Sequence, residues 1–212
     1  INLSGEWEFY WNQILYSEDF KDENFRSKLS GYIKVPSDWN KFKINNKNIP
    51  AIGHATYRLL IKLDRPDIYG LDIRNLCSSY NLWINGNKVF NTGKVGLNKN
   101  ESYPEYKPVV LKIEPYNNEL ELIFQFSNYY YANGSGIWNN IVMGKYNNIH
   151  RNNDKSIYRD FFLVGCYLIM AIYFICIVLI RRRDLSALYF GLLCLLLMLR
   201  NISTGNLIIQ IL

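Results

Sequence analysis

Hydrophobic and polar positions alternate with a period of two through the first two thirds of the chain. In residues 5–11, GEWEFYW, three aromatic side chains share one face, and two glutamates and a tyrosine share the other. This alternation is typical of a half-buried β-strand. The same pattern, bounded each time by Gly, Pro or Asn, predicts further strands at residues 31–36, 55–63, 69–75, 107–113 and 119–128.

Two local signals complete the prediction for this region. Residues 81–93 are expected to form a β-hairpin, because the pair Asn85-Gly86 accepts the positive φ angles of a type I′ turn. Ser17, followed by two acidic residues, predicts a helix N-terminus and a short helix to about Asn24. Eight or so short strands with one short helix favour a mainly β fold, an antiparallel sandwich or jelly roll.

The pattern changes in the last third of the chain, where charged residues disappear from long runs. Residues 161–180 contain none, and about 20 residues at about 1.5 Å each match a hydrocarbon core about 30 Å thick. A second run ends at Arg200, whose side chain can reach the membrane interface. The alternative, a buried helical hairpin of a soluble protein, needs a very large core. The expected organisation is a β-domain at 1–148, a polar juxtamembrane linker at 149–158, transmembrane helices at 159–180 and 185–200, a cytoplasmic loop at 181–184, and the start of a third transmembrane helix at 204–212.

The formal net charge of +6 is unevenly distributed. Arg181, Arg182 and Arg183 supply three of the positive charges, and the region before the linker is close to balanced, which argues against nucleic-acid binding. Arginines in a short loop between two spans favour the cytoplasmic side. The β-domain is therefore expected outside the cytoplasmic membrane, with membrane lipid around the helices. Because the sequence lacks an initial methionine and stops inside an apolar run, we expect a processed start and a longer multi-pass protein.

Residues with catalytic or metal-binding chemistry are sparse. Three of the four cysteines lie in apolar runs and only Cys77 lies in the β-domain, so no disulfide can close within that domain. His54 and His150 lack the spacing of metal ligands, and no cofactor is expected. Neither a glycine-rich phosphate-binding motif nor a nucleophile motif occurs. The sequence therefore predicts no enzymatic activity for this region.

Aromatic residues make up 16% of the chain and are the remaining signal for function. Those on alternating strands are expected in the core, whereas others lie in or beside loops rich in Asn, Gly and Pro. Flat rings in such loops suit stacking on a sugar-like ring, and polar neighbours suit hydrogen bonds to a small polar ligand. Ordinary loop packing is the alternative. For Arg58 in particular, the alternative role is to pin a loop without contacting a ligand. The candidate ligand-binding residues are Trp39, Arg58, Glu105, Tyr106, Asn128, Tyr130 and Trp138.

Six segments precede the apolar runs in a fixed order: SGEWEFYWNQIL, VPSDWN, GHATYRLLI, YNLWINGNKVFNTGKVG, ESYPEYKP and FSNYYYANGSGIW. Together they resemble the extracellular region of bacterial seven-transmembrane receptors with diverse intracellular signalling modules. The resemblance implies a galactose-binding-like jelly roll, similar also to the sugar-binding sandwich at the front of family-two glycoside hydrolases. It further implies a sensor whose C-terminal part carries a kinase, a cyclase or a similar output.

Three functions are compatible with these observations. The first is a ligand-sensing, carbohydrate-binding ectodomain joined through membrane helices to a signalling output. The second is the carbohydrate-binding module of a membrane-tethered carbohydrate-active enzyme. The third is the outer domain of a transporter or assembly protein that only contacts partners. A homodimer is compatible with all three.

Overall fold

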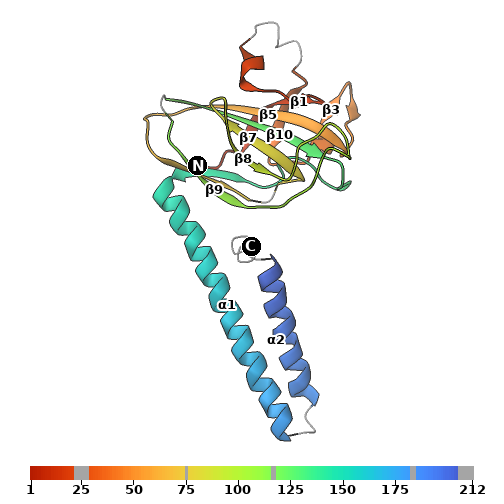
Figure 1. The fold of residues 1–212 in the computed structure, drawn as a ribbon, viewed down its shortest axis with the longest axis vertical. Helices are drawn as coiled ribbons and strands as arrows, with labels where there is room; N and C mark the ends of the chain where they lie inside the picture. Colours follow the sequence, from red (N-terminus) through yellow and green to blue (C-terminus); the bar gives the residue numbers. More distant parts are fainter. Residues whose placement is uncertain (22–28, 75, 116–117, 182–184, 205–212) are drawn as a thin grey trace. The chain divides into compact units, whose positions relative to one another are not determined.

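The computed structural model describes residues 1–21, 29–74, 76–115, 118–181 and 185–204 (Figure 1). The chain divides into two compact units. Ile1–Ile149 form a β-domain, and His150–Leu212 contain most of helix α1 and all of helix α2. The boundary falls within the first two turns of α1, so the β-domain includes the start of that helix.

Two antiparallel sheets build the β-domain. The six-stranded sheet has the order β2-β1-β5-β10-β7-β8, and the three-stranded sheet has the order β11-β6-β9. The larger sheet consists of β2 (Gly31–Val35), β1 (Gly5–Trp11), β5 (Gly53–Lys62), β10 (Glu119–Asn128), β7 (Ser79–Ile84) and β8 (Asn87–Thr92). The smaller sheet consists of β11 (Ile141–Lys145), β6 (Tyr69–Ile73) and β9 (Val109–Ile113). A short hairpin adds β3 (Lys43–Ile44) and β4 (Lys47–Asn48), and the described parts of the connections contain the 3-10 turns η1 (Ser17–Phe20) and η3 (Trp39–Lys41).

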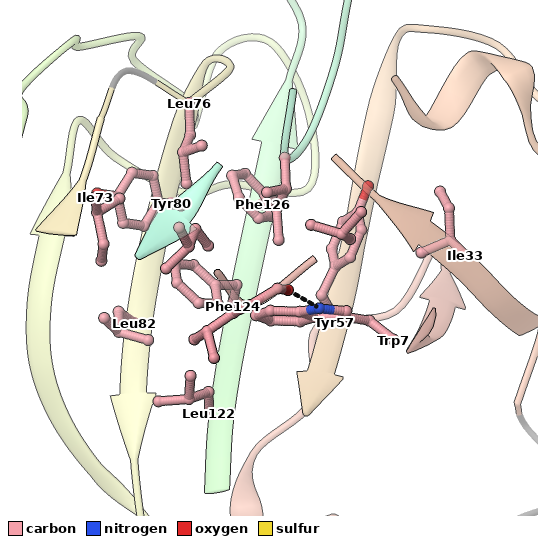
Figure 2. Packing of buried hydrophobic residues seen from close by; sticks show 14 of the residues in the cluster. Trp7, Ile33, Tyr57, Ile73, Leu76, Tyr80, Leu82, Leu122, Phe124 and Phe126 are labelled. Atoms are coloured by element: carbon pink, nitrogen blue, oxygen red, sulfur yellow. Dashed lines mark hydrogen bonds between the residues drawn. The ribbon is translucent and has the colours of Figure 1, made fainter. Parts of the chain in front are cut away.

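One hydrophobic core joins the two sheets, and aromatic rings fill much of it (Figure 2). The Trp7 and Phe124 ring centroids lie 5.9 Å apart, and Leu71 of the smaller sheet belongs to the same buried cluster. The Trp7 indole N–H donates to the Leu3 carbonyl at 3.0 Å, so burial leaves no unpaired donor on this ring. Full burial of one large apolar side chain of this kind stabilises the folded state by about 1.5–3 kcal/mol. The mainly β, antiparallel sandwich that the alternation predicts is confirmed.

The predicted strands and the hairpin are also found. β5 and β10 pair along their whole lengths, which are the longest in the domain. In the hairpin turn Asn85 has a φ of 49° and Gly86 a φ of 83°, both positive as a type I′ turn requires. The strand predicted from residue 107 begins later, at Val109, because Pro108 has no N–H to donate to a neighbouring strand.

Two elements of the β-domain are not predicted by the alternation. In β11, Gly144 interrupts the run of side chains, and a Cβ at this position would lie 3.3 Å from Ile149. The glycine therefore allows a close contact that a sequence pattern does not reveal. The β3–β4 hairpin turns on Asn45 and Asn46, whose φ angles of 51° and 61° are tolerated by asparagine.

The helix predicted from residue 17 to about residue 24 is shorter than expected. The structure has the single 3-10 turn η1, and its N-cap is Tyr16 rather than Ser17. The Asp19 carboxylate accepts the Tyr16 backbone N–H at 2.8 Å, which starts the turn one residue earlier. Most of the remaining predicted helix falls on residues outside those that the structure describes.

Helix α1 (Tyr146–Arg181) and helix α2 (Leu185–Thr204) follow the β-domain. Residues 149–158, expected to form an irregular linker, are helical instead. Side chains one turn apart stabilise this polar part of α1, since the His150 ring lies 2.8 Å from the Asp154 carboxylate. This polar segment is therefore part of helix α1.

Both helices are long and apolar enough to cross a membrane. Little of either apolar window is buried within the described structure, unlike the core helix of a soluble protein. The two helices pack where the Phe174 and Phe190 ring centroids are 4.6 Å apart, and Gly191 leaves room for Phe174 at this contact. The predicted loop at 181–184 and the predicted third helix at 204–212 lie almost entirely outside the described residues.

Candidate ligand-binding surface

Trp39 and Asn128, two of the predicted ligand contacts, are fully buried. The Trp39 indole nitrogen lies 3.1 Å from the carbonyl oxygens of Pro50 and Ala51. The Asn128 amide nitrogen donates to the Tyr131 carbonyl at 2.7 Å and also lies 2.9 Å from Ala51 O. Both side chains therefore join loops that are distant in the sequence, and neither offers a face for stacking. Their role is to hold the loops in shape.

Arg58 lies on the outward face of the six-stranded sheet, between glutamates on the two neighbouring strands. Its Nε donates to Glu121 at 2.7 Å, and its Nη1 donates to Glu8 at 3.1 Å. The Phe20 ring covers the guanidinium, with 4.4 Å between the guanidinium carbon and the ring centroid. With its charge paired and its plane covered, Arg58 pins β1, β5 and β10 to the segment that follows β1.

Four tyrosine rings are exposed on loops that contact one another. The Tyr130 hydroxyl donates to Ser102 O at 3.3 Å and so joins the loop after β10 to the loop after β8. The Tyr131 ring packs edge-on against the half-buried Trp138, with centroids 5.7 Å apart and planes at 80°. We call these four side chains the tyrosine surface: Tyr103 (66% exposed), Tyr106 (42%), Tyr130 (50%) and Tyr131 (40%).

Tyr106 is braced by Cys77 beneath the tyrosine surface. Burial, together with the neighbouring Cys77 thiol, raises the pKa of the Tyr106 hydroxyl to about 12. Cys77 is itself buried, burial raises the pKa of its thiol to about 11, and its sulfur lies 3.5 Å from Gly134 O. Both groups therefore stay protonated at neutral pH. The Tyr106 hydroxyl is thus held by the thiol, and the exposed part of the side chain is neutral.

Glu105 fixes the base of the loop between β8 and β9. Its carboxylate accepts the Gly93 N–H at 2.8 Å, and its own N–H donates to Ser78 O at 3.1 Å. Gly93 has a φ of 61°, and a Cβ there would collide with the Tyr103 carbonyl oxygen, so the turn requires glycine. Glu105 is exposed near Tyr106, but its carboxylate and its backbone N–H are engaged by Gly93 and Ser78.

A hollow of about 280 Å³ opens on the outward face of the six-stranded sheet. Its floor contains Asn81 of β7 and Gln125 of β10, which are partners across the two strands. The segment after β1 forms one wall, and the loop after β8 forms the other. The alternation places both amides on the outward face, but nothing in the sequence pattern indicates the walls beside them. The other lining residues are Ile14, Tyr16, Val95, Gly96, Leu97 and Glu101.

The two histidines have protein partners. Nδ1 of His54 lies 2.9 Å from the Tyr129 hydroxyl, which also contacts the Leu97 carbonyl at the edge of the hollow, and burial lowers the pKa of His54. His150 pairs with Asp154 in α1. Within the part of the chain that the structure describes, no group of three or more His, Cys, Asp or Glu residues could hold a metal ion.

Comparisons with known proteins concern the fold. No model of a known protein family matches the sequence, and no curated protein matches it significantly. Similar solved structures include two of a glycosyl hydrolase family 2 member from Bacteroides cellulosilyticus, each 18% identical, with TM-scores of 0.51 and 0.50. Each match covers 68% of this chain and 20% of the hydrolase. A family 2 β-galacturonidase from Eisenbergiella tayi, bound to galacturonate, is 14% identical with a TM-score of 0.46, and that match covers 68% and 24% of the two chains.

At this identity the similarity shows the fold alone. The chain spans about a fifth of the length of the Bacteroides hydrolase and shares the fold of that part. Two apolar helices accompany the sandwich here. The chain is thus a mainly β antiparallel sandwich, similar to part of a family 2 glycosyl hydrolase, followed by two helices long and apolar enough to cross a membrane.

Proposed function

We propose that this chain is a membrane-anchored carbohydrate-binding protein whose β-domain lies on the outer side of the membrane. The observation that carries the proposal is the tyrosine surface, in which exposed rings stand on loops that brace one another. An aromatic face with a hydroxyl at its edge can stack on a sugar ring and also form hydrogen bonds with sugar hydroxyls. The sandwich fold, similar to part of a sugar-cleaving enzyme, supports this function.

The bracing of the loops favours binding because rings that are already ordered lose little entropy when a ligand arrives. A ring stacked on one tyrosine contributes about 1 kcal/mol beyond burial, and each exposed hydrogen bond contributes a similar amount. With roughly three to five such contacts, less the cost of association, we expect dissociation constants between about 1 μM and 1 mM. This range suits reversible sensing or capture of an abundant ligand.

Helices α1 and α2 provide the membrane anchor in this proposal. Their apolar windows are long and largely unburied, and the arginines at 181–183 lie between them. Positive charge between two spans favours the cytoplasmic side and so places the β-domain outside. Single cysteines introduced by Asn98→Cys or Arg182→Cys, in a chain without the native cysteines, can be labelled on intact cells with an impermeant maleimide. Labelling at position 98 alone is expected. Labelling at position 182 alone would show that the chain has the opposite orientation in the membrane.

Reception of a signal is a second candidate function, favoured by the direct succession of β11 (Ile141–Lys145) and α1 without an intervening loop. Ile149, in the first turns of α1, is buried, and a Cβ at Gly70 of β6 would lie 2.9 Å from the Ile149 Cβ. The start of the helix is therefore packed against the central strand of the smaller sheet. A ligand that binds two arrangements of this contact with different affinity would bias the helix. The resemblance to seven-transmembrane receptors agrees with this candidate.

A glycan array tests the carbohydrate proposal. The chain, labelled and held in lipid nanodiscs, is applied to neutral, amino and acidic saccharides, with empty nanodiscs as the control. We expect at least one saccharide class to retain the protein and free saccharide of that class to compete. An array without any retained spot makes a protein partner at the tyrosine surface the better explanation.

A further inference from the structure

We infer that the hollow on the outward face of the six-stranded sheet is a separate subsite, which accepts one neutral or amine-bearing sugar unit and rejects acidic sugars. The inference rests on the proposed carbohydrate-binding function and adds a place and a ligand class to it. Its starting point is the pair of amides on the floor, Asn81 and Gln125.

Hydrogen bonds fix the orientation of both floor amides. The Trp83 indole can only donate, and it lies 3.0 Å from Gln125 Oε1, so this atom is the amide oxygen. Gln125 Nε2 accordingly donates to the Leu15 carbonyl at 2.9 Å. Asn81 Nδ2 donates to the same Gln125 oxygen at 3.1 Å. The buried Gln125 is thus held from three sides and holds Asn81 in one orientation.

Asn81 keeps hydrogen-bonding capacity that its protein contacts do not use. One N–H is engaged by Gln125, whereas the second N–H and the Oδ1 oxygen have no partner among the described residues. One donor and one acceptor on a rigid planar group match two neighbouring hydroxyl groups of a sugar ring. Because Asn81 is already oriented, this contact requires little ordering on binding.

The charge of the lining sets which sugars fit. The Glu101 carboxylate accepts the Leu97 N–H at 3.3 Å and an Asn98 side-chain N–H at 2.5 Å, which leaves acceptor sites for a ligand. Among the described residues that line the hollow, none is cationic, and Lys99 of the same loop packs over the Tyr130 ring instead. A sugar hydroxyl or ammonium group can donate to Glu101. The carboxylate of an acidic sugar would be repelled by Glu101 without a compensating cation.

The shape of the hollow fits a single sugar ring. Its volume of about 280 Å³ is just below the range for drug-sized small-molecule sites, about 300–1,000 Å³, as expected for a smaller ligand. Tyr16 forms an aromatic wall, held edge-on against Trp83 with ring centroids 5.2 Å apart and planes at 85°. Ile14 adds apolar surface for the C–H face of a pyranose.

Calorimetric titration of the full chain in lipid nanodiscs tests the subsite with two probes that differ only at carbon 6, methyl β-D-glucoside and methyl β-D-glucuronide. We expect the glucuronide to bind at least tenfold more weakly than the glucoside. Asn81→Leu should weaken glucoside binding at least tenfold. Asn87→Leu, at an exposed position on β8 outside the lining, should change it less than twofold. Glu101→Gln should reduce the difference between the two probes.

The outcomes separate this inference from the function on which it rests. Equal binding of both probes overturns the subsite, as does unchanged glucoside binding by an Asn81→Leu chain with a normal melting temperature. If Asn81→Leu does not fold, the test of the subsite is Glu101→Gln on the exposed loop. A ratio of glucoside to glucuronide affinity that this variant leaves unchanged overturns the subsite. If sugar binding depends only on the tyrosine surface, the proposed function is supported and the subsite in the hollow is contradicted. If the chain binds no sugar, both the proposed function and the subsite are contradicted.

Discussion

The Nε atom of Arg58 and the Glu121 carboxylate lie 2.7 Å apart on neighbouring strands, on the outward face of the six-stranded sheet. The side chains are only 17% and 16% exposed, and the same guanidinium also reaches Glu8 on β1. One cation thus joins three strands where water has limited access. Removal of a single partner leaves a charge without its hydrogen bonds.

Replacement of Arg58 is therefore expected to affect stability and to leave ligand binding intact. Arg58→Met should lower the free energy of unfolding by about 1–3 kcal/mol, because two glutamates lose charge-assisted hydrogen bonds. Urea unfolding measures this effect. Lys112→Met is the control, because it breaks an exposed ion pair with Glu114 and should hardly move the midpoint. A loss of sugar affinity at unchanged stability would make Arg58 a ligand contact after all.

The lowered pKa of His54 predicts that the free energy of unfolding falls in mildly acidic solution. Burial lowers the pKa of His54 in the folded chain, whereas in the unfolded chain it is about 6.5. The unfolded chain therefore binds the proton at higher pH, and the free energy of unfolding decreases as pH falls below about 6.5 towards the folded pKa. Urea unfolding between about pH 8 and pH 5 should show a smaller decrease for His54→Gln than for the wild type. Identical slopes for the two chains would rule out this role of His54.

Residues 1–149 are expected to fold without the helical unit. All the strands among the described residues and the main hydrophobic core lie within residues 1–149, and the cysteine of this region, Cys77, is free and buried. The isolated domain should give a β-type circular dichroism spectrum and one cooperative melt. Addition of a chelator and a reductant should not change the melt. A collapse caused by the chelator would reveal a metal on which the fold depends.

The contact between Gly70 and Ile149 predicts a selective effect on the start of α1. Gly70→Ala places a Cβ 2.9 Å from the Ile149 Cβ, so the first turns of the helix must shift. Amide hydrogen exchange at Tyr146, whose N–H donates to the Ile68 carbonyl at 3.1 Å, should become faster. Gly165→Ala, which meets open space in the same helix, serves as the control and should leave this exchange unchanged. Equal protection in both variants would argue against a tight connection between sheet and helix.

Alternation predicted the strands because a side chain at every second position must enter one core. Tyr57 on β5 and Phe124 on β10 illustrate this, since both are fully buried at paired positions. The hairpin turn was predictable because Asn85-Gly86 is a local conformational signal. These features depend on neighbours in the sequence or on a simple period.

The site was less predictable because burial of a loop aromatic depends on distant residues. Trp39 and Tyr131 both lie in polar loops, yet only Trp39 is covered completely, and its partners are the carbonyls of Pro50 and Ala51. The walls of the hollow likewise depend on long-range contacts, such as the Leu15 N–H donating to the Thr56 hydroxyl at 3.1 Å. A sequence pattern identifies the residue types in the loops but not which of them reach solvent.

The central claim is that the tyrosine surface binds a sugar, and direct titration of the full chain in nanodiscs with the saccharide selected by the array tests it best. The wild type should bind with a dissociation constant between about 1 μM and 1 mM. Tyr106→Ala and Trp138→Ala should each weaken binding at least tenfold, whereas Tyr32→Ala, which removes an exposed ring on β2, should change it less than twofold. Binding that survives both loop substitutions, or the absence of any saccharide binding to the wild type, would contradict the account.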